Sequence, residues 1–359
     1  MAKKRRVVGD GVIRPIDHFD GVHALARPQD RLREVRKRAA RFREEMLGGP
    51  VARYYGSHEL VRVPYPTRYG FLNVRGLHTP FMHIVNRLFI VQFDTESGVK
   101  TLLVSPSDAD ANAETPFFKR LSDSFGPAKA LGQRLIAPKA ASVEQILARV
   151  GVAPEAVDYI TYDHLHTQDV RRWMGTKDRP GLFPNAKLLV MRQEWESTLG
   201  LLPPQRQWYC PNGIKDIDET RVVLLDSDVQ LGECVWLVRT PGHTEGNHSI
   251  VVHTPEGLMV TSENGVGPDA YAPLHSDMAA VREYAYSTGM EVVMNGNTLE
   301  RAVDQYISMV LEKEIAGPSV RDERFPNVVC SSEFGAYWAF PGIKPSFQFG
   351  DLEFGLVSR

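Results

Sequence analysis

The arrangement that most constrains the fold of this chain is a short apolar strand that runs directly into a polar, histidine-containing loop, and it occurs twice. Residues 156–161 predict a strand that leads into the segment YDHLHTQD at 162–169. Residues 235–239 predict a second strand, which leads into TPGHTEGNH at 240–248. Proteins of the α/β class present their functional sites on loops of this kind. We therefore expect an α/β protein whose site is built from these two loops.

Hydrophobic periodicity and turn residues predict further elements around the two loops. A turn sequence, TESG at 95–98, separates two strand-like runs and indicates a hairpin. Ser142 and Gln145 form a capping-box pair at the start of a helix that Gly151 ends. The predicted strands cover residues 81–93, 99–104, 249–253, 257–261 and 326–329, and the predicted helices cover residues 28–46, 143–150 and 297–315.

The charge balance excludes several classes of partner. Forty-two Lys and Arg residues against 44 Asp and Glu residues give a formal charge of −2, which provides no overall attraction to nucleic acid or to an anionic membrane. No window offers the roughly 18 apolar residues of a membrane span, and no apolar stretch of signal-peptide length follows the N-terminus. We therefore expect a cytoplasmic protein that acts on a small-molecule substrate. The basic cluster KKRR at 3–6 is interpreted as a solvated terminus rather than a nuclear-import patch.

The cysteines and the N-terminal region predict no chemistry of their own. Cys210, Cys234 and Cys330 are widely spaced and form no Cys-x-x-Cys pair, so we expect reduced core residues. Residues 1–75 are interpreted as an N-terminal extension that carries an amphipathic helix at 28–46. Its apolar stripe is expected to pack either on the main domain or on a second subunit, which leaves open a homo-oligomer through the extension.

Three histidines carry the candidate chemistry. Two imidazoles two residues apart, His164 and His166, can converge on one metal ion at the end of a strand. His243 follows the second strand in a Pro-Gly-His turn, where we expect Gly242 to supply an unusual backbone angle. Three histidines and an open coordination position describe a catalytic zinc site, where the metal lowers the pKa of bound water to about 7.

At these residues the chain resembles the metallo-β-lactamase-fold superfamily. The signature of that superfamily is His-x-His-x-Asp-His after a strand, a later Pro-Gly-His-Thr-x-Gly turn, an aspartate after a hairpin and a final histidine. His164 and His166 match the first motif, and TPGHTEGNHS at 240–249 matches the second. The resemblance implies an αββα sandwich with the metal at one edge of the sheets. It implies a catalytic domain over residues 76–335, with the tail at 336–359 packed on it.

The chain departs from the pattern at the second metal position. Gln168 and Asp169 stand where the superfamily has Asp-His, Glu263 stands where it has the bridging aspartate, and no histidine occurs near the final position at 327–333. One zinc ion on the three histidines is therefore the preferred interpretation. Should a second ion bind, Asp169 and Glu263 would be its ligands, and this oxygen-rich pair suits iron or manganese better than zinc.

These observations favour a metal-dependent hydrolase in which a metal-bound hydroxide attacks an ester, lactone, amide or similar bond. Asp169 or Glu263 would hold or deprotonate the water. Two alternatives remain open at this point: a di-iron or other redox enzyme on the same fold, and a metal-poor binding or scaffold protein. The sequence also leaves open whether Asp163 orients a ligand histidine or caps its loop, and whether Glu263 only caps a turn.

Overall fold

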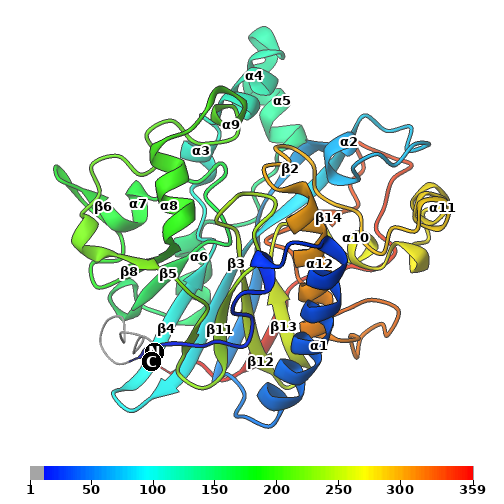
Figure 1. The fold of residues 1–359 in the computed structure, drawn as a ribbon. Coiled ribbons are helices and arrows are strands. Elements are labelled where there is room, and N and C mark those ends of the chain that lie inside the picture. Colours follow the sequence, from blue (N-terminus) through cyan, green and yellow to red (C-terminus); the bar gives the residue numbers. More distant parts are fainter. Residues whose placement is uncertain (1–11, 359) are drawn as a thin grey trace.

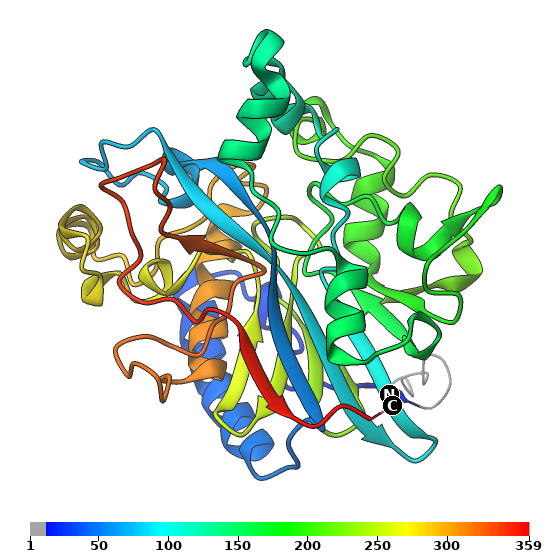
Figure 2. The same ribbon diagram turned by 180° about the vertical axis from the view of Figure 1, so that it is seen from behind.

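The computed structural model describes residues 12–358, apart from the side chains of residues 128–130. Two β-sheets lie face to face and helices cover their outer surfaces, so the predicted αββα sandwich is confirmed (Figures 1 and 2). The KKRR cluster at 3–6 lies outside the described residues. No helix within residues 12–358 combines the length and the apolar character needed to cross a membrane.

The smaller sheet is antiparallel throughout, and its order is β1-β10-β11-β12-β13. The larger sheet has the order β15-β2-β3-β4-β5-β8-β9, with β14 paired to β3 and parallel pairing from β4 to β9. The strands are β1 (Ile13–Pro15), β2 (Tyr54–Pro66), β3 (Phe81–Thr95), β4 (Gly98–Val104), β5 (Tyr159–Thr161), β6 (Gly175–Thr176), β7 (Arg179–Pro180), β8 (Lys187–Met191), β9 (Val222–Leu225), β10 (Val229–Leu231), β11 (Val235–Arg239), β12 (His248–Thr254), β13 (Gly257–Thr261), β14 (Ser332–Gly335) and β15 (Leu352–Gly355).

The helices lie outside the sheets or in the connections between strands (Figure 1). They are α1 (Pro28–Leu47), α2 (Thr67–Gly70), α3 (Ala109–Asn112), α4 (Pro116–Asp123), α5 (Lys129–Ile136), α6 (Val143–Val150), α7 (Arg171–Met174), α8 (Arg192–Leu199), α9 (Pro203–Arg206), α10 (Pro268–Tyr271), α11 (Ala279–Thr288) and α12 (Ala302–Ala316). Short 3-10 turns complete the set: η1 (Val22–Ala24), η2 (Gly126–Ala128), η3 (Pro154–Ala156), η4 (Glu219–Arg221) and η5 (Pro273–His275).

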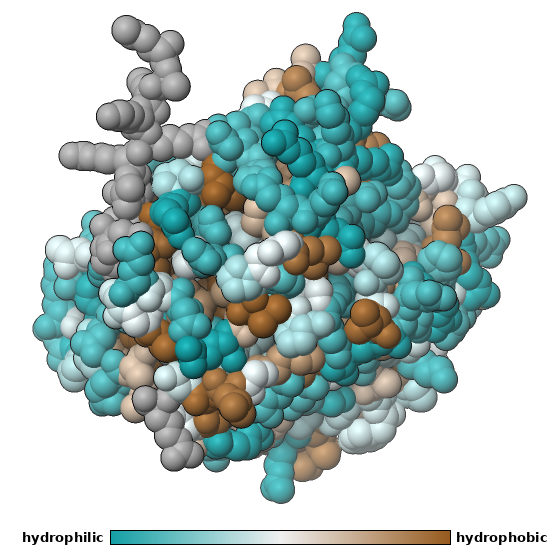
Figure 3. Space-filling view, turned by 90° about the horizontal axis from the view of Figure 1, so that it is seen from below, coloured by the Kyte–Doolittle hydropathy of each residue, from teal (hydrophilic) through white to brown (hydrophobic). Residues whose placement is uncertain are grey.

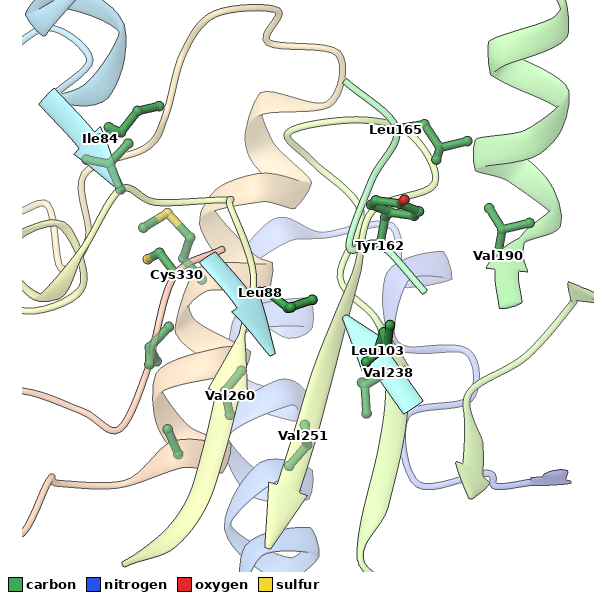
Figure 4. Close-up of a cluster of buried hydrophobic side chains, with 14 of the residues drawn as sticks. Ile84, Leu88, Leu103, Tyr162, Leu165, Val190, Val238, Val251, Val260 and Cys330 are labelled. Atoms are coloured by element: carbon green, nitrogen blue, oxygen red, sulfur yellow. The ribbon is translucent and has the colours of Figure 1, made fainter. Parts of the chain in front are cut away.

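Apolar side chains fill the space between the layers. Phe89 and Val91 of β3 belong to one buried cluster with Leu237 of β11 and Ile250 of β12, and this cluster joins the two sheets. A second cluster continues to the outer helices and reaches the strand end at Leu165 (Figure 4). Burial on both sides of the sheets gives the loops that follow β5 and β11 a rigid base.

The N-terminal region is part of the sandwich rather than an appendage to it. β1 pairs with β10, and β2 pairs with β3 along its whole length, so the sheets begin inside the stretch that was expected to be an extension. The apolar stripe of α1 packs within the same chain, where the ring of Phe42 lies 5.6 Å from that of Trp236. The stripe of α1 therefore packs on the main domain, which is one of the two alternatives that the sequence leaves open.

Several predicted elements agree with the structure in detail. The predicted helix at 297–315 and the predicted strand at 326–329 differ from it. The capping box of Ser142 and Gln145 is formed, and Gly151 ends α6 with a φ of 86°. The helix predicted to start at residue 297 starts only at Ala302. Thr298 instead donates a hydrogen bond to the His243 carbonyl, and Leu299 has a φ of 54°, so this stretch is a loop. The strand predicted at 326–329 is reduced to isolated bridges at Pro326 and Val328.

The end of the molecule seen from below in Figure 1 carries mainly hydrophilic residues. Apolar patches on this face are small and separated from one another outside the residues drawn in grey (Figure 3). Isolated apolar patches of this kind are normal for a protein surface.

Candidate metal centre

The two predicted loops meet at one edge of the sandwich. β5 leads the chain to His164 and His166, and β11 leads it to His243. Ligand nitrogens of the three imidazoles all lie within 4.8 Å of one another. The ring centroids form a nearly equilateral triangle with sides of 4.7, 4.8 and 4.9 Å. All three side chains are buried.

The protonation of the rings suits a cation. Nδ1 of His166 lies 3.2 Å from Nε2 of His243, so these two nitrogens point at a shared position. Burial, reinforced by the neighbouring His164, lowers the pKa of His243 to about 3 and holds the pKa of His166 well below its usual value. Neutral imidazoles, as at His166 and His243, offer lone pairs, and a set of three histidines is one that zinc favours. The residues present therefore fit a zinc-type ion.

Asp163 fixes the ring of His164 from behind. Its Oδ1 lies 3.2 Å from His164 Nδ1, although not in good hydrogen-bond alignment, and accepts the backbone N–H of His164 at 3.1 Å. Its Oδ2 accepts a hydrogen bond from Ser331 at 2.8 Å. Burial alone would lower the pKa of His164, but the charge of Asp163 outweighs it and raises the pKa to about 9. Asp163 thus combines the two roles that the sequence left open.

Two glycines let the His243 turn pack against helices. A Cβ at Gly242 would overlap the backbone of Gln305 in α12, and one at Gly246 would overlap the backbone of Glu194 in α8. The unusual backbone angle expected at Gly242 is wrong, because its φ is not positive. Gly242 is needed because the turn approaches the backbone of α12 too closely for a side chain.

Glu194 joins the two loops and was not found by sequence reasoning. Its carboxylate accepts hydrogen bonds from Leu165 N at 2.8 Å and from Thr244 Oγ1 at 2.6 Å, and thereby connects the first loop to the second. Burial raises the pKa of this carboxyl. Glu194 lies in the first turn of α8 and in no recognised motif, so its local sequence carries no signal of this contact.

Glu263 points into the site, as expected from its position after β13. It forms a group of potential ligands with Asp163 and His164. Its Oε2 accepts a hydrogen bond from Ser331 at 3.3 Å, so its partner lies next to β14 and not in its own turn. Burial raises the pKa of Glu263 to about 7, and the charge of Asp163 adds to this rise. The arrangement disfavours the turn-capping interpretation.

Asp169 does not reach the histidines, and this corrects its expected role as metal ligand and catalytic residue. The side chain of Arg171 contacts both of its carboxylate oxygens, and the backbone N–H of Arg171 donates to Oδ1 at 3.0 Å. Asp169 belongs to neither group of potential ligands among the described residues. The pair of Asp169 and Glu263 is therefore not assembled, and the second iron or manganese site loses its ligands. The pair of Asp169 and Glu263 therefore gives the di-iron alternative no support.

Gln168 also turns away from the histidines. Its Oε1 accepts hydrogen bonds from Ser107 at 3.0 Å and from Asn112 at 3.2 Å, so the amide oxygen is committed to the loop around α3. Asn297 lies on the wall of the cavity, and its Oδ1 is buried without a hydrogen-bond partner among residues 12–358. The sequence predicts a helix over this stretch, so it gives no indication that Asn297 lines a site.

A cavity of about 620 Å³ opens from the three histidines. Glu263, Asn297 and Ser332 line it, and Trp208 contributes to its wall. Residues of α3, α4 and α5 also line it. The apolar part of the lining includes Val61, Val63, Ile84, Ala113, Phe118, Leu121, Phe125 and Ile136.

Two other histidines of the chain lie outside the triangle. His248 is buried and its Nε2 lies 3.1 Å from Thr161 Oγ1, which indicates a packing role. His275 is exposed at the end of η5.

Comparisons with known proteins give distant relatives. No family model matches the chain. An N-acyl homoserine lactonase of Bacillus sp is 27% identical over 145 residues, which cover 38% of this chain and 52% of that protein. The same enzyme of Bacillus cereus is 27% identical over 142 residues, which cover 37% and 51%. The chain thus spans about half the length of the curated relatives it matches.

Among solved structures, a probable metal-dependent hydrolase from Staphylococcus aureus superposes with a TM-score of 0.50 at 12% identity, over 72% of this chain and 83% of that one. At this identity the superposition establishes the fold alone. It agrees with the two-sheet architecture that carries the histidine loops.

Proposed function

We propose that this chain, which belongs to the metallo-β-lactamase superfamily, is a metal-dependent hydrolase of a small molecule that contains an ester, lactone or amide bond. The observation that carries the proposal is the buried triangle of His164, His166 and His243 at one end of a large cavity. A metal-free binding protein would have no physical reason to bury three convergent imidazoles there, since burial of unpaired polar groups costs free energy.

The three histidines would hold one zinc-type ion. When bound, such an ion polarises a carbonyl oxygen and lowers the pKa of water. Glu263 is the carboxylate placed to hold water or to accept its proton, because its Oε2 is oriented by Ser331 and its side chain lines the cavity. Asn297 Oδ1, which is buried and unpartnered, is available to accept a hydrogen bond from the substrate.

The cavity lining supports a substrate with an apolar arm. Phe118, Leu121 and Phe125 from the segment over the cavity face the same space as Val63 and Ile84 of the larger sheet. A cavity of about 620 Å³ is in the range of small-molecule sites. The curated relatives are named as lactonases of N-acyl homoserine lactones, molecules that join a lactone ring to an acyl chain. We accordingly rank acylated lactones first among the candidate substrates.

The test combines metal analysis with a substrate panel. Purified protein would be analysed for metal content and assayed with zinc on N-acyl homoserine lactones of increasing chain length and on p-nitrophenyl esters. We expect His166→Ala to lose both metal and hydrolysis, and His275→Ala to retain both, since His275 is exposed outside the site. Full retention of metal and activity in His166→Ala would refute the proposal.

A further inference from the structure

Each histidine of the triangle has one ring nitrogen that faces the shared position and one that faces away. For His164, the outward nitrogen is Nδ1, which meets Asp163 at 3.2 Å. For His166, Nδ1 faces His243, so Nε2 is the outward nitrogen. A histidine that binds metal through one nitrogen carries a proton on the other, and this proton needs an acceptor.

The outward nitrogen of His166 faces the carboxylate of Glu300. The Nε2 atom is buried and has no hydrogen-bond partner in the described part of the chain. Oε1 of Glu300 lies 4.0 Å from it, and the Glu300 side chain is only 7% exposed. The separation exceeds a hydrogen bond by about 1 Å, a gap that a small side-chain adjustment closes.

Other groups hold the Glu300 carboxylate in this place. Gln205 at the end of α9 donates its side-chain N–H to Oε1 at 2.9 Å. The backbone N–H of Glu245, in the turn that carries His243, donates to Oε2 at 2.9 Å. The Glu300 carboxylate is thus held by α9 and by the His243 turn, and it is directed at the loop that carries His166.

If Glu300 had a purely structural role, only one of its two carboxylate oxygens would need a buried partner. A carboxylate that simply capped the Glu245 turn would use Oε2 and could leave Oε1 in water, where a charge is most stable. Glu300 instead buries Oε1 beside the imidazole of His166. Burial of a charge costs free energy unless an opposite charge is near, and a cation held by His166 would provide that charge.

We propose that Glu300 is a positioning residue for the metal ligand His166. Its Oε1 accepts the Nε2–H of His166 when the ring binds a cation through Nδ1, and it thereby fixes the tautomer and the orientation of the ring. This inference rests on the proposed function, because it requires that the three histidines hold a metal.

The experiment compares two matched substitutions in the full chain. Glu300→Gln removes the charge and keeps the size, and Glu283→Gln makes the same change on an exposed side chain of α11. The dissociation constant for zinc would be measured by competition with a chromophoric chelator. The visible absorption of the cobalt-substituted proteins would report on ligand geometry, and thermal unfolding of the metal-free proteins would report on stability.

We expect Glu300→Gln to weaken zinc binding by roughly 10- to 100-fold and to change the cobalt spectrum, with little change in metal-free stability. Glu283→Gln should behave as the unmodified chain. An unchanged zinc affinity and spectrum in Glu300→Gln would overturn the proposal, as would a loss of metal-free stability that accounts for the weaker binding. Failure of the unmodified chain to bind zinc would instead overturn the proposed function itself.

Discussion

The side chain of Arg171 holds the carboxylate of Asp169, with Nε at 2.9 Å from Oδ1 and 3.1 Å from Oδ2. This ion pair directs the Asp169 side chain toward Arg171 within the loop after β5. Asp169 is buried, and its charge is balanced by the guanidinium rather than by a metal ion. A residue that the sequence places among the metal ligands therefore stabilises the loop that presents them.

The first prediction concerns Asp169→Asn. Zinc affinity should stay within about threefold of the unmodified chain, while the free energy of unfolding should fall by roughly 1–3 kcal/mol because charge-assisted hydrogen bonds are lost. Urea unfolding and chelator competition would measure the two quantities. A large loss of metal without loss of stability would return Asp169 to the ligand set.

The second prediction concerns stoichiometry. The chain should retain about one metal ion after extensive dialysis, and Gln168→Asp should not add a second, because position 168 faces Ser107 and Asn112 rather than the histidines. Elemental analysis of both proteins would test this. Two equivalents in the unmodified chain would contradict it and would require ligands other than Asp169.

The third prediction concerns Glu263→Gln. The amide preserves the size of the side chain and its contact with Ser331, but it cannot take up a proton. We expect hydrolysis to slow by roughly 10²-fold or more, with the fold intact by circular dichroism. Metal content measured in parallel separates the roles: a proton acceptor retains the metal, and a ligand loses affinity for it. A normal rate with normal metal content would remove Glu263 from the site.

The fourth prediction concerns Gly246→Ala. The added methyl group would overlap the backbone of Glu194, so either the turn or α8 must shift. We expect a loss of about 1–3 kcal/mol in unfolding free energy, together with weaker zinc binding, because the shift moves the His243 loop. Gly200→Ala is the control, since a Cβ there meets only Glu196 O, at 3.6 Å. Equal stability of the two variants would show that the turn is not tightly packed.

The fifth prediction concerns pH and Glu312, which accepts hydrogen bonds from Ser249, Asn264 and Tyr271 beneath the His243 turn. Burial raises the pKa of Glu312 from 4.5 to about 7. The folded chain therefore binds this proton more tightly than the unfolded chain does. The resulting stabilisation is fully present below the unfolded pKa and is lost as the pH rises through the folded pKa.

Glu312→Gln removes this dependence. The stability of the unmodified chain minus that of the variant should fall as the pH rises between 4.5 and about 7, and it should level off above that range. Urea unfolding at a series of pH values would measure the difference. A constant difference across the range would show that the carboxyl does not titrate there.

The local sequence determined the elements whose signals are short-range. The capping box at Ser142, the hairpin around residues 95–98 and the two strand-to-loop transitions all depend on neighbours within a few residues, and the structure contains each of them. The convergence of His164, His166 and His243 was also predictable, because loops that follow strands of packed sheets gather at a common edge.

Only the tertiary structure decided what each carboxylate does. Asp169 and Glu263 look equivalent in the sequence, yet one meets Arg171 and the other enters the cavity. Glu194 and Glu300 reach the site from α8 and from the loop before α12, far from either motif. The physical reason is that a charged side chain is directed by the partners that compensate its burial. Those partners come from distant segments, which only the folded chain brings together.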